Sequence, residues 1–372
     1  VRIGGVFKLR LEAVTPLFVG TGQHTTPLDH VLLKGRLYVL DQERLIRELG
    51  ERAEALVEWL EESAINAGRR AKPVIRDFLE REGLLETEFL EKVSAYSLEL
   101  STPLEAEPPR LNLFVKTASH LPYLPGSEVK GAIRTALLLS RMDPDELAET
   151  LSSIRLGGRG EARRIRNELG RIWRGMEENA FGSRGELMRS VMIGDSAPVP
   201  IESLRVETIG TVGSSRPIYF HVEAARPGTV FEMDLALGRE GIGPGEMTAA
   251  LHRRSELMLE LEMARFGGQR WMRREIERLA ELNEIDSPLL RLGWGQGFLG
   301  VTVAAALAAD RPDALEKLRL LLSRSFGQYR RTKRDNFPKT RRLALDARGR
   351  PKHPLGWAKV RICRYTSSSP TT

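Results

Sequence analysis

Twice along the chain a glycine-rich turn leads directly into a helical pattern, and this arrangement restricts the possible folds more than any other feature. The first turn, at 124–126, precedes the pattern 128–141, and the second, at 293–300, precedes the pattern 301–309. Stretches that alternate apolar and polar residues, such as 7–14, lie upstream and predict half-buried strands. Strands mixed with helices in this way predict an α+β fold.

The sequence predicts two domains of related design, divided near residue 200. A chain of 372 residues is long enough for about two domains, at roughly 150 residues each. The predicted N-terminal domain spans 1–200 and contains helical insertions at about 41–98 and 141–180. The predicted C-terminal domain spans 201–366, with a helical insertion at about 245–285 and a basic C-terminal segment. Residues 367–372 are expected to form a disordered tail.

Local signals predict individual elements. The segment 31–40 predicts a β-hairpin that turns at Lys34 and Gly35. Asp41 is expected to cap one long helix that continues to about residue 64. Further helices are expected at 74–82, 87–98, 144–154 and 161–178, and strands that pair with one another are expected at 204–211, 217–225 and 229–237.

The positive charge is concentrated near the C-terminus. The chain has 57 basic and 50 acidic residues, a net charge of +7. Residues 323–372 contain 14 Lys and Arg against Asp335 and Asp346, a local net charge of +12, so the remaining residues sum to −5. This segment also contains many apolar residues, Trp357 and Val360 among them. It therefore predicts a folded basic face that binds nucleic acid, with a general abundance of surface arginine as the alternative.

Composition excludes several classes of protein. Cys363 is the only cysteine in the sequence, which excludes an internal disulfide and a cysteine-based zinc cluster. No stretch approaches the roughly 20 apolar residues of a membrane-spanning helix, and the first residues lack a secretory signal pattern. The chain is therefore expected to be soluble and cytoplasmic. No metal site and no cofactor are predicted.

The segment 124–134 is the most specific candidate for a binding site. Pro125 and Gly126 favour a tight turn, and Ser127 is expected to cap the helix that follows. The first amides of a helix attract anions. Lys130 and Arg134 lie four residues apart, on one helix face. An ordinary capped helix with surface charges is the alternative.

The second glycine turn, 293–300, contains the pattern G-x-G-x-x-G from Gly295. It lacks the βαβ context and the later acidic residue of a dinucleotide site. With Arg291 and Trp294 beside it, a loop that contacts phosphates or bases fits better, and a purely structural turn is the alternative. Trp294 and Trp357 are both candidates for stacking on a base, and a place in the core is the alternative for each.

Two loop residues are weak candidates for catalysis. His24 could act as a general base in RNA cleavage without a metal, and Asp29 is a second loop candidate. No spacing of the other histidines matches a metal-ligand motif, and no nucleophile elbow is present. A structural role is the alternative for both residues.

Five segments together resemble the RAMP superfamily of CRISPR-associated proteins, and within it most closely the fifth subunits of the type III-A Csm effector complex. They are TPLFVGTG (15–22), PYLPGSEVKG (122–131), RLGWGQG (291–297), FPKTRR (337–342) and PLGW (354–357). The resemblance implies two ferredoxin-like (RRM-like) domains. It also implies a subunit that caps the 3′ end of the CRISPR RNA beside the repeated backbone RAMP subunit, and that supports RNA maturation, with host nucleases as further partners.

The resulting prediction is a non-catalytic RNA-binding subunit of a CRISPR ribonucleoprotein in antiviral defence. One alternative is a CRISPR RNA endoribonuclease, either metal-independent with His24 or metal-dependent with Asp29. The other is a structural adaptor that contacts mainly protein. The predicted RNA contacts come from the glycine turns and the cations beside them: Gly20, Gly22, Gly126, Ser127, Lys130, Arg134, Arg291, Gly293, Trp294, Gly295, Gly297, Lys339, Arg341 and Arg342.

Overall fold

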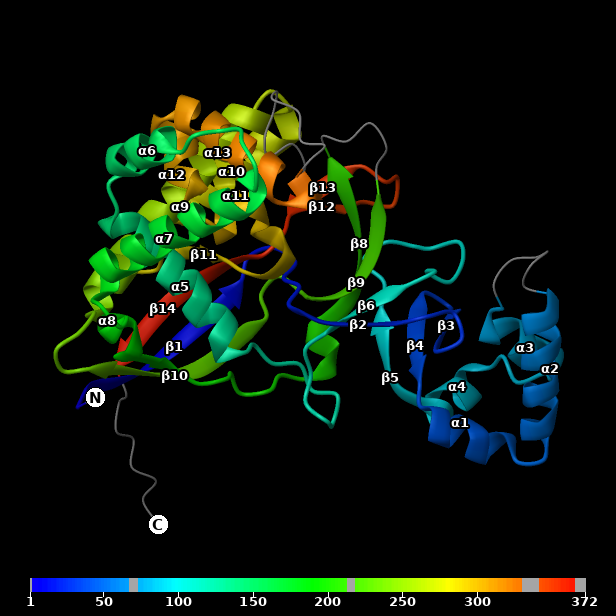
Figure 1. The fold of residues 1–372 in the computed structure, drawn as a ribbon. Coiled ribbons are helices and arrows are strands. Elements are labelled where there is room, and N and C mark those ends of the chain that lie inside the picture. The colour runs from blue at the N-terminus through cyan, green and yellow to red at the C-terminus, as the bar shows by residue number, and fades with distance from the viewer. Residues whose placement is uncertain (1, 67–72, 213–217, 330–340, 365–372) are drawn as a thin grey trace, which may run out of the picture.

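The computed structural model describes residues 2–66, 73–212, 218–329 and 341–364. The described strands form three sheets, and a thick layer of helices covers one of them (Figure 1). The predicted α+β class is confirmed. The predicted tail at 367–372 and Lys339 lie outside the described residues.

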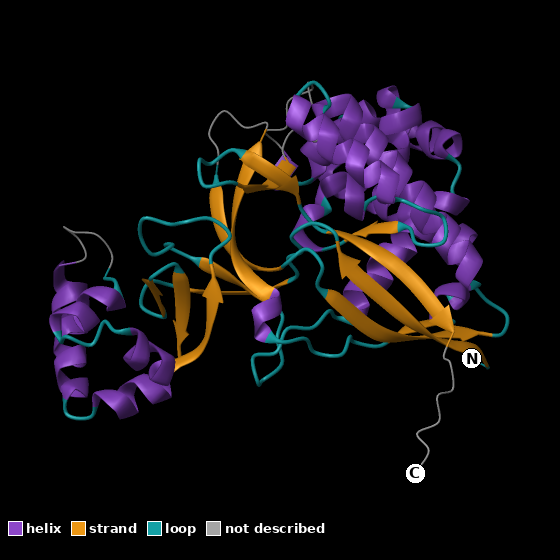
Figure 2. Cartoon of the chain, turned by 180° about the vertical axis from the view of Figure 1, so that it is seen from behind, coloured by secondary structure: helices purple, strands orange, loops and turns teal. Residues whose placement is uncertain are grey.

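The first sheet has the order β11-β14-β1-β10-β7, with antiparallel pairing throughout. Its strands are β1 (Ile3–Ala13), β7 (Val191–Ile193), β10 (Val230–Gly238), β11 (Leu289–Arg291) and β14 (Trp357–Arg364). The central strand β1 alternates as predicted, and its side chains Leu9 and Leu11 are fully buried. Seen from behind in Figure 2, this sheet lies beneath the helical layer.

The second sheet has the order β13-β12-β8-β9-β6-β2. Its strands are β2 (Gly20–Thr25), β6 (Leu111–Phe114), β8 (Leu204–Val212), β9 (Tyr219–Ala225), β12 (Arg341–Leu345) and β13 (Pro351–Pro354). The β6–β9 pair is parallel and the other pairs are antiparallel. Side chains from this sheet and the first sheet, such as Phe114 and Phe231, join one hydrophobic core.

Apolar side chains at helical spacing pack the helices of the helical layer into the hydrophobic core. In α5 (Gly126–Arg141) the residues Val129, Ile133 and Leu137 recur every four positions and are fully buried. The other elements of this layer are α6 (Pro144–Ser153), α7 (Glu161–Phe181), α8 (Glu186–Arg189), α9 (Pro244–Phe266), α10 (Arg270–Leu282), η2 (Gly293–Gly295), α11 (Gly297–Val301), α12 (Ala304–Asp310), α13 (Pro312–Ser325) and η3 (Gly327–Tyr329).

A separate lobe projects from the second sheet (Figure 1). It combines the three-stranded sheet β3-β4-β5 with four short helices and has its own hydrophobic core around Phe78 and Leu90. Its elements are β3 (His30–Leu33), β4 (Arg36–Leu40), α1 (Gln42–Leu49), α2 (Arg52–Asn66), α3 (Ile75–Arg81), α4 (Thr87–Val93) and β5 (Ser94–Glu99). The predicted hairpin is confirmed, and Lys34 and Gly35 both have positive φ at its turn.

Several local predictions were wrong. The helix predicted at 41–64 is two helices, because Gly50 ends α1 with φ of +54°. The helix predicted at 87–98 ends at Val93, and β5 follows because its residues pair with β4. Only two of the three strands predicted to pair with one another do so: β8 pairs with β9, whereas β10 pairs with β1 and β7. The helix predicted at 301–309 is interrupted between α11 and α12.

The two larger sheets each take strands from both sides of residue 200. β1 and β7 lie in the same sheet as β10, β11 and β14, and β2 and β6 lie in the same sheet as β8 and β9. The domain boundary near residue 200 and the two ferredoxin-like domains stay predictions. Within the described ranges, no helix is both long enough and apolar enough to cross a membrane.

Candidate nucleic-acid interface

Helix α5 begins where the chain passes very close to β7. A Cβ at Gly126 would collide with the carbonyl oxygens of Ile193 and Gly194, so only glycine fits there. The Gly126 N–H donates to Asp195 Oδ1 at 2.8 Å. The capping position is Pro125 rather than the predicted Ser127, which is exposed in the first turn. A protein carboxylate thus already takes one of the amides that were predicted to bind an anion.

Glu128, also in the first turn of α5, contacts the second glycine turn. Its Oε1 accepts hydrogen bonds from the Gly293 N–H at 2.8 Å and from Gln296 Nε2 at 3.1 Å. The predicted phosphate-binding amide of Gly293 therefore donates to a side chain of the same protein. This contact links two segments that lie 165 residues apart.

The second glycine turn is a packed junction between several segments. A Cβ at Gly293, which has φ of +62°, would overlap the Phe18 carbonyl, and a Cβ at Gly295 would overlap the Leu355 carbonyl. Gly297, with φ of +63°, is exposed but lies against Arg341. The geometry therefore favours the structural alternative for Gly293 and Gly295.

Arg291 and Arg341 are buried in an ion-pair cluster, which differs from the predicted RNA contact. Both guanidinium groups pair with Glu262 of α9, and Arg341 Nε lies 2.8 Å from Glu262 Oε1. Arg291 is 1% exposed and Glu262 is fully buried. Trp357 is also fully buried, so it cannot stack on a base. Arg254 lies beside this cluster and donates to Gln296 Oε1.

Residues 20–25, which contain Gly20 and Gly22 and the catalytic candidate His24, form the edge strand β2 rather than a loop. Gly20, Gly22 and His24 lie exposed on β2, and the pairing with β6 is irregular between Gly20 and His24. Asp29 accepts hydrogen bonds from the backbone N–H and the hydroxyl of Thr26, at 2.8 and 2.7 Å. Asp29 thus closes the turn before β3.

The exposed face of α5 is open and basic. Ser127, Lys130, Gly131 and Arg134 follow one another at helical spacing on this face; Ser127 and Gly131 are exposed, and Lys130 and Arg134 are partly buried. A Cβ built on Gly131 meets nothing within 4 Å, so the helix backbone is accessible there. Burial lowers the pKa of the Lys130 ammonium group.

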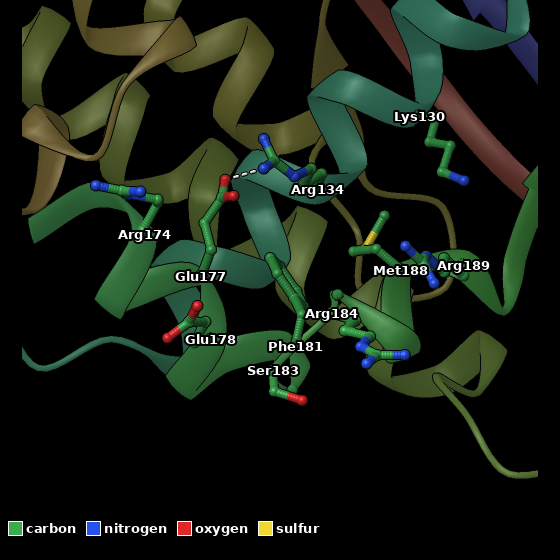
Figure 3. Close-up of a pocket in the computed structure, with 12 residues that line it drawn as sticks. Lys130, Arg134, Arg174, Glu177, Glu178, Phe181, Ser183, Arg184, Met188 and Arg189 are labelled. Carbon is green, nitrogen blue, oxygen red and sulfur yellow. Dashed lines mark hydrogen bonds and ion pairs between the residues drawn. The ribbon is translucent and has the colours of Figure 1, made fainter. Parts of the chain in front are cut away.

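This face forms one wall of a pocket of about 380 Å³ between α5, the end of α7 and α8 (Figure 3). The pocket is lined by five cations and two carboxylates, together with small and apolar residues. The charged residues are Lys130, Arg134, Arg174, Glu177, Glu178, Arg184 and Arg189.

The charges in this pocket do not cancel one another. Arg134 pairs with Glu177 and also lies over the ring of Trp173, with Cζ 5.7 Å from its centroid. Within the part of the chain that the structure describes, Lys130, Arg184 and Arg189 have no carboxylate within ion-pair distance. The pocket therefore presents unpaired cations to solvent.

Sequence reasoning found only the α5 wall of this pocket. Arg174, Arg184 and Arg189 come from the region around the insertion at 141–180, to which no motif could be assigned. The sequence signal that could have indicated these arginines is the pair Gly182 and Gly185. Both glycines have positive φ and separate α7 from α8, so the chain turns back toward α5 there.

Comparison with known proteins identifies the family. A sequence model of the RAMP superfamily matches residues 10–351, which is most of the chain. The chain belongs to the RAMP superfamily. This confirms the predicted resemblance.

One curated relative of this RAMP superfamily chain is the "CRISPR system Cms protein Csm5" of Methanocaldococcus jannaschii. The two are 27% identical over 164 residues, which cover 42% of this chain and 37% of the relative. The match therefore spans little more than a third of the length of that relative.

Two solved structures have the same fold. One chain of a Csm–crRNA–target RNA ternary complex of a type III-A CRISPR-Cas system matches with a TM-score of 0.71 and 24% identity, covering 95% of this chain and 100% of that chain. The crystal structure of T. onnurineus Csm5 matches with a TM-score of 0.63 and 23% identity, covering 94% of this chain and 99% of that chain.

Proposed function

We propose that this RAMP superfamily chain is an RNA-binding subunit of a type III-A CRISPR ribonucleoprotein of the Csm type. In this proposal it caps the 3′ end of the CRISPR RNA and supports maturation of that RNA. Its partners are the CRISPR RNA and the other Csm subunits, chiefly the repeated backbone RAMP subunit, with host nucleases as further partners. The observation that carries the proposal is the pocket in which Lys130, Arg184 and Arg189 lack carboxylate partners among the described residues.

The pocket chemistry suits a ribose-phosphate backbone. Phosphates are bound by Lys and Arg whatever the base, and an RNA that recognises its target by base pairing needs a protein that holds only its backbone. The open backbone at Gly131 allows a strand to lie close to α5. Similarity to Csm5 and to a chain of a Csm–crRNA complex supports the CRISPR RNA as the natural ligand.

Removing two unpaired pocket cations tests the site. In a Lys130→Gln, Arg184→Gln variant, the affinity for a single-stranded CRISPR RNA at about 0.1 M salt should fall by roughly tenfold. The slope of log affinity against log salt should flatten by about 1.4, because each lost phosphate contact on a single strand contributes about 0.7. Filter binding across a salt series measures both quantities.

The matched control removes the same charge from the lobe. Lys34→Gln with Arg47→Gln takes two exposed cations from the β3–β4 turn and from α1, so the net charge changes equally. This control should bind RNA like the wild type. Equal losses in the two variants would mean that only total charge matters, and an unchanged slope in the pocket variant would remove the pocket from the interface.

Binding and cleavage assays with other RNAs and variants distinguish the competing functions. A circular RNA that binds as tightly as its linear form would contradict end capping while leaving RNA binding intact. Cleavage that His24→Ala abolishes, or that a chelator and Asp29→Ala abolish, would favour an endoribonuclease. Absence of binding by the full chain at any salt concentration would favour the structural adaptor.

Gly131 provides a test that does not change charge. Because its Cβ would enter open space within a helix, Gly131→Ala should raise the free energy of unfolding by about 0.5–1 kcal/mol. The added methyl group should nevertheless weaken RNA binding if the strand lies on α5. Gly170→Ala in α7 also places its Cβ in open space and should stabilise the protein without affecting RNA. Equal RNA affinity of both variants would show that no strand approaches Gly131.

A further inference from the structure

A cluster of aromatic rings surrounds one arginine on the second sheet. The Cζ atom of Arg342 lies 4.5 Å from the centroid of Trp294 and 5.9 Å from that of Phe220. Trp294 meets Phe18 and Phe220 edge-to-face, with centroid distances of 4.8 and 5.7 Å. The Trp294 N–H of the backbone also donates to the Phe18 carbonyl oxygen, at 3.1 Å. These contacts fix the position of the indole beneath the guanidinium.

Arg342 differs from its neighbour Arg341 in the contacts of its guanidinium group. Arg341 is 5% exposed at its side chain and pairs with Glu262. Among the residues that the structure describes, no carboxylate or carbonyl oxygen accepts a hydrogen bond from the guanidinium group of Arg342, whose backbone pairs with β8. Its side chain is only partly buried, so its N–H groups are available to a ligand. A guanidinium presents planar donors to phosphate and a flat face to a base.

A structural cation–π contact would explain the stacking on Trp294, but it gives the guanidinium N–H donors of Arg342 no acceptor among the described residues. A nucleotide satisfies both features, because its base can stack on the guanidinium and its phosphate can accept from the N–H edge. The rigid indole lowers the entropy that Arg342 would lose on binding. The same glycine turn also contacts α5, since Gly293 donates to Glu128, so the cluster and the α5 face belong to adjoining elements.

We propose that Arg342, supported by Trp294, is a stacking site for one unpaired base of the bound RNA, and that its N–H groups donate to the adjoining phosphate. This proposal rests on the proposed RNA-binding function. It assigns base stacking to the Arg342–Trp294 cluster and backbone binding to the pocket beside α5. The ligand class is single-stranded RNA.

An abasic scan of the RNA tests the stacking site in the full chain. Each nucleotide in turn is replaced by an abasic residue, and affinity is measured for the wild type and for Arg342→Lys. One abasic position should weaken wild-type binding by between about 5-fold and 100-fold, as expected for a base stacked on a side chain. The same position should have little effect in Arg342→Lys, because lysine keeps the charge but lacks the planar face.

Two controls separate stacking from charge and from damage to the fold. Arg348→Lys, an exposed position between β12 and β13, should behave like the wild type in the scan. Urea unfolding of Arg342→Lys identifies any loss of stability. If the RNA binds the wild type in a salt-dependent way but no abasic position weakens binding, the stacking site is overturned and the RNA-binding function is not. A sensitive position that persists unchanged in Arg342→Lys would also overturn the stacking site, and absence of RNA binding would overturn both proposals.

Discussion

Replacing Glu262 by glutamine should lower the free energy of unfolding by about 3–5 kcal/mol, the cost of breaking a buried ion pair. Glu262 is fully buried and its single negative charge is paired with two guanidinium groups, those of Arg291 and Arg341. Arg254 adds a third buried cation nearby, and burial together with Arg291 lowers its pKa to about 10. Without the carboxylate, these cations would lie in the core without compensation. Urea unfolding followed by circular dichroism measures the loss.

Glu260→Gln is the matched control, because Glu260 lies exposed on the same helix. Its free energy of unfolding should stay within about 0.5 kcal/mol of the wild type. Equal losses in the two variants would contradict a special role for the buried carboxylate.

The pH dependence gives a second test of the Glu262 cluster. Burial raises the pKa of Glu262, but Arg291 and Arg341 outweigh it and hold that pKa below its ordinary value. A carboxyl with a lowered folded-state pKa contributes stability above its unfolded pKa of about 4.5 and loses it as pH falls through the folded value. The wild type should therefore lose stability below about pH 4.5 more steeply than Glu262→Gln. Parallel curves for the two proteins would contradict this linkage.

Gly295→Ala should destabilise the protein by about 3 kcal/mol, at the upper end of the range for overpacking. The new Cβ would overlap the carbonyl oxygen and carbon of Leu355 and approach the Gly356 nitrogen. These are backbone atoms of the two residues just before β14, so they cannot rotate away as a side chain would. The substitution should lower the midpoint of thermal unfolding.

Gly170→Ala is the matched glycine control, because its Cβ enters open space in α7. It should raise the unfolding midpoint slightly, since alanine favours the helix. A Gly295→Ala protein as stable as the wild type would mean that the chain can separate the glycine turn from β14 at little cost.

Local signals in the sequence predicted those features that depend on neighbouring residues. The hairpin turn at Lys34 and Gly35, the alternation along β1 and the presence of a helix over 128–141 are set within a few positions. The α+β class followed from such elements. The end of the predicted helix at 87–98 was missed because β5 forms through pairing with β4, which lies more than 50 residues earlier.

The candidate site was predicted only in part, because contacts between residues far apart in the sequence leave no local signal. Lys130 belongs to a motif and could be recognised from its spacing on α5. Arg291 looked like an RNA contact because its partner, Glu262, lies in a helical insertion without a motif. Likewise, the glycine turn looked like a phosphate cradle because Glu128, 165 residues earlier, gives no sign in the sequence that it accepts the Gly293 amide.

The position of β14 has a consequence for biosynthesis. β1, near residue 10, lies between β10 and β14, so one edge of the central strand stays unpaired until residues 357–364 have been made. At about 5–20 residues per second, this wait lasts roughly 20–70 seconds. During that time Leu9 and Leu11 lack part of their core, and the free strand edge is open to pairing with other chains. A nascent chain of this protein is therefore expected to engage a chaperone until β14 has left the ribosome.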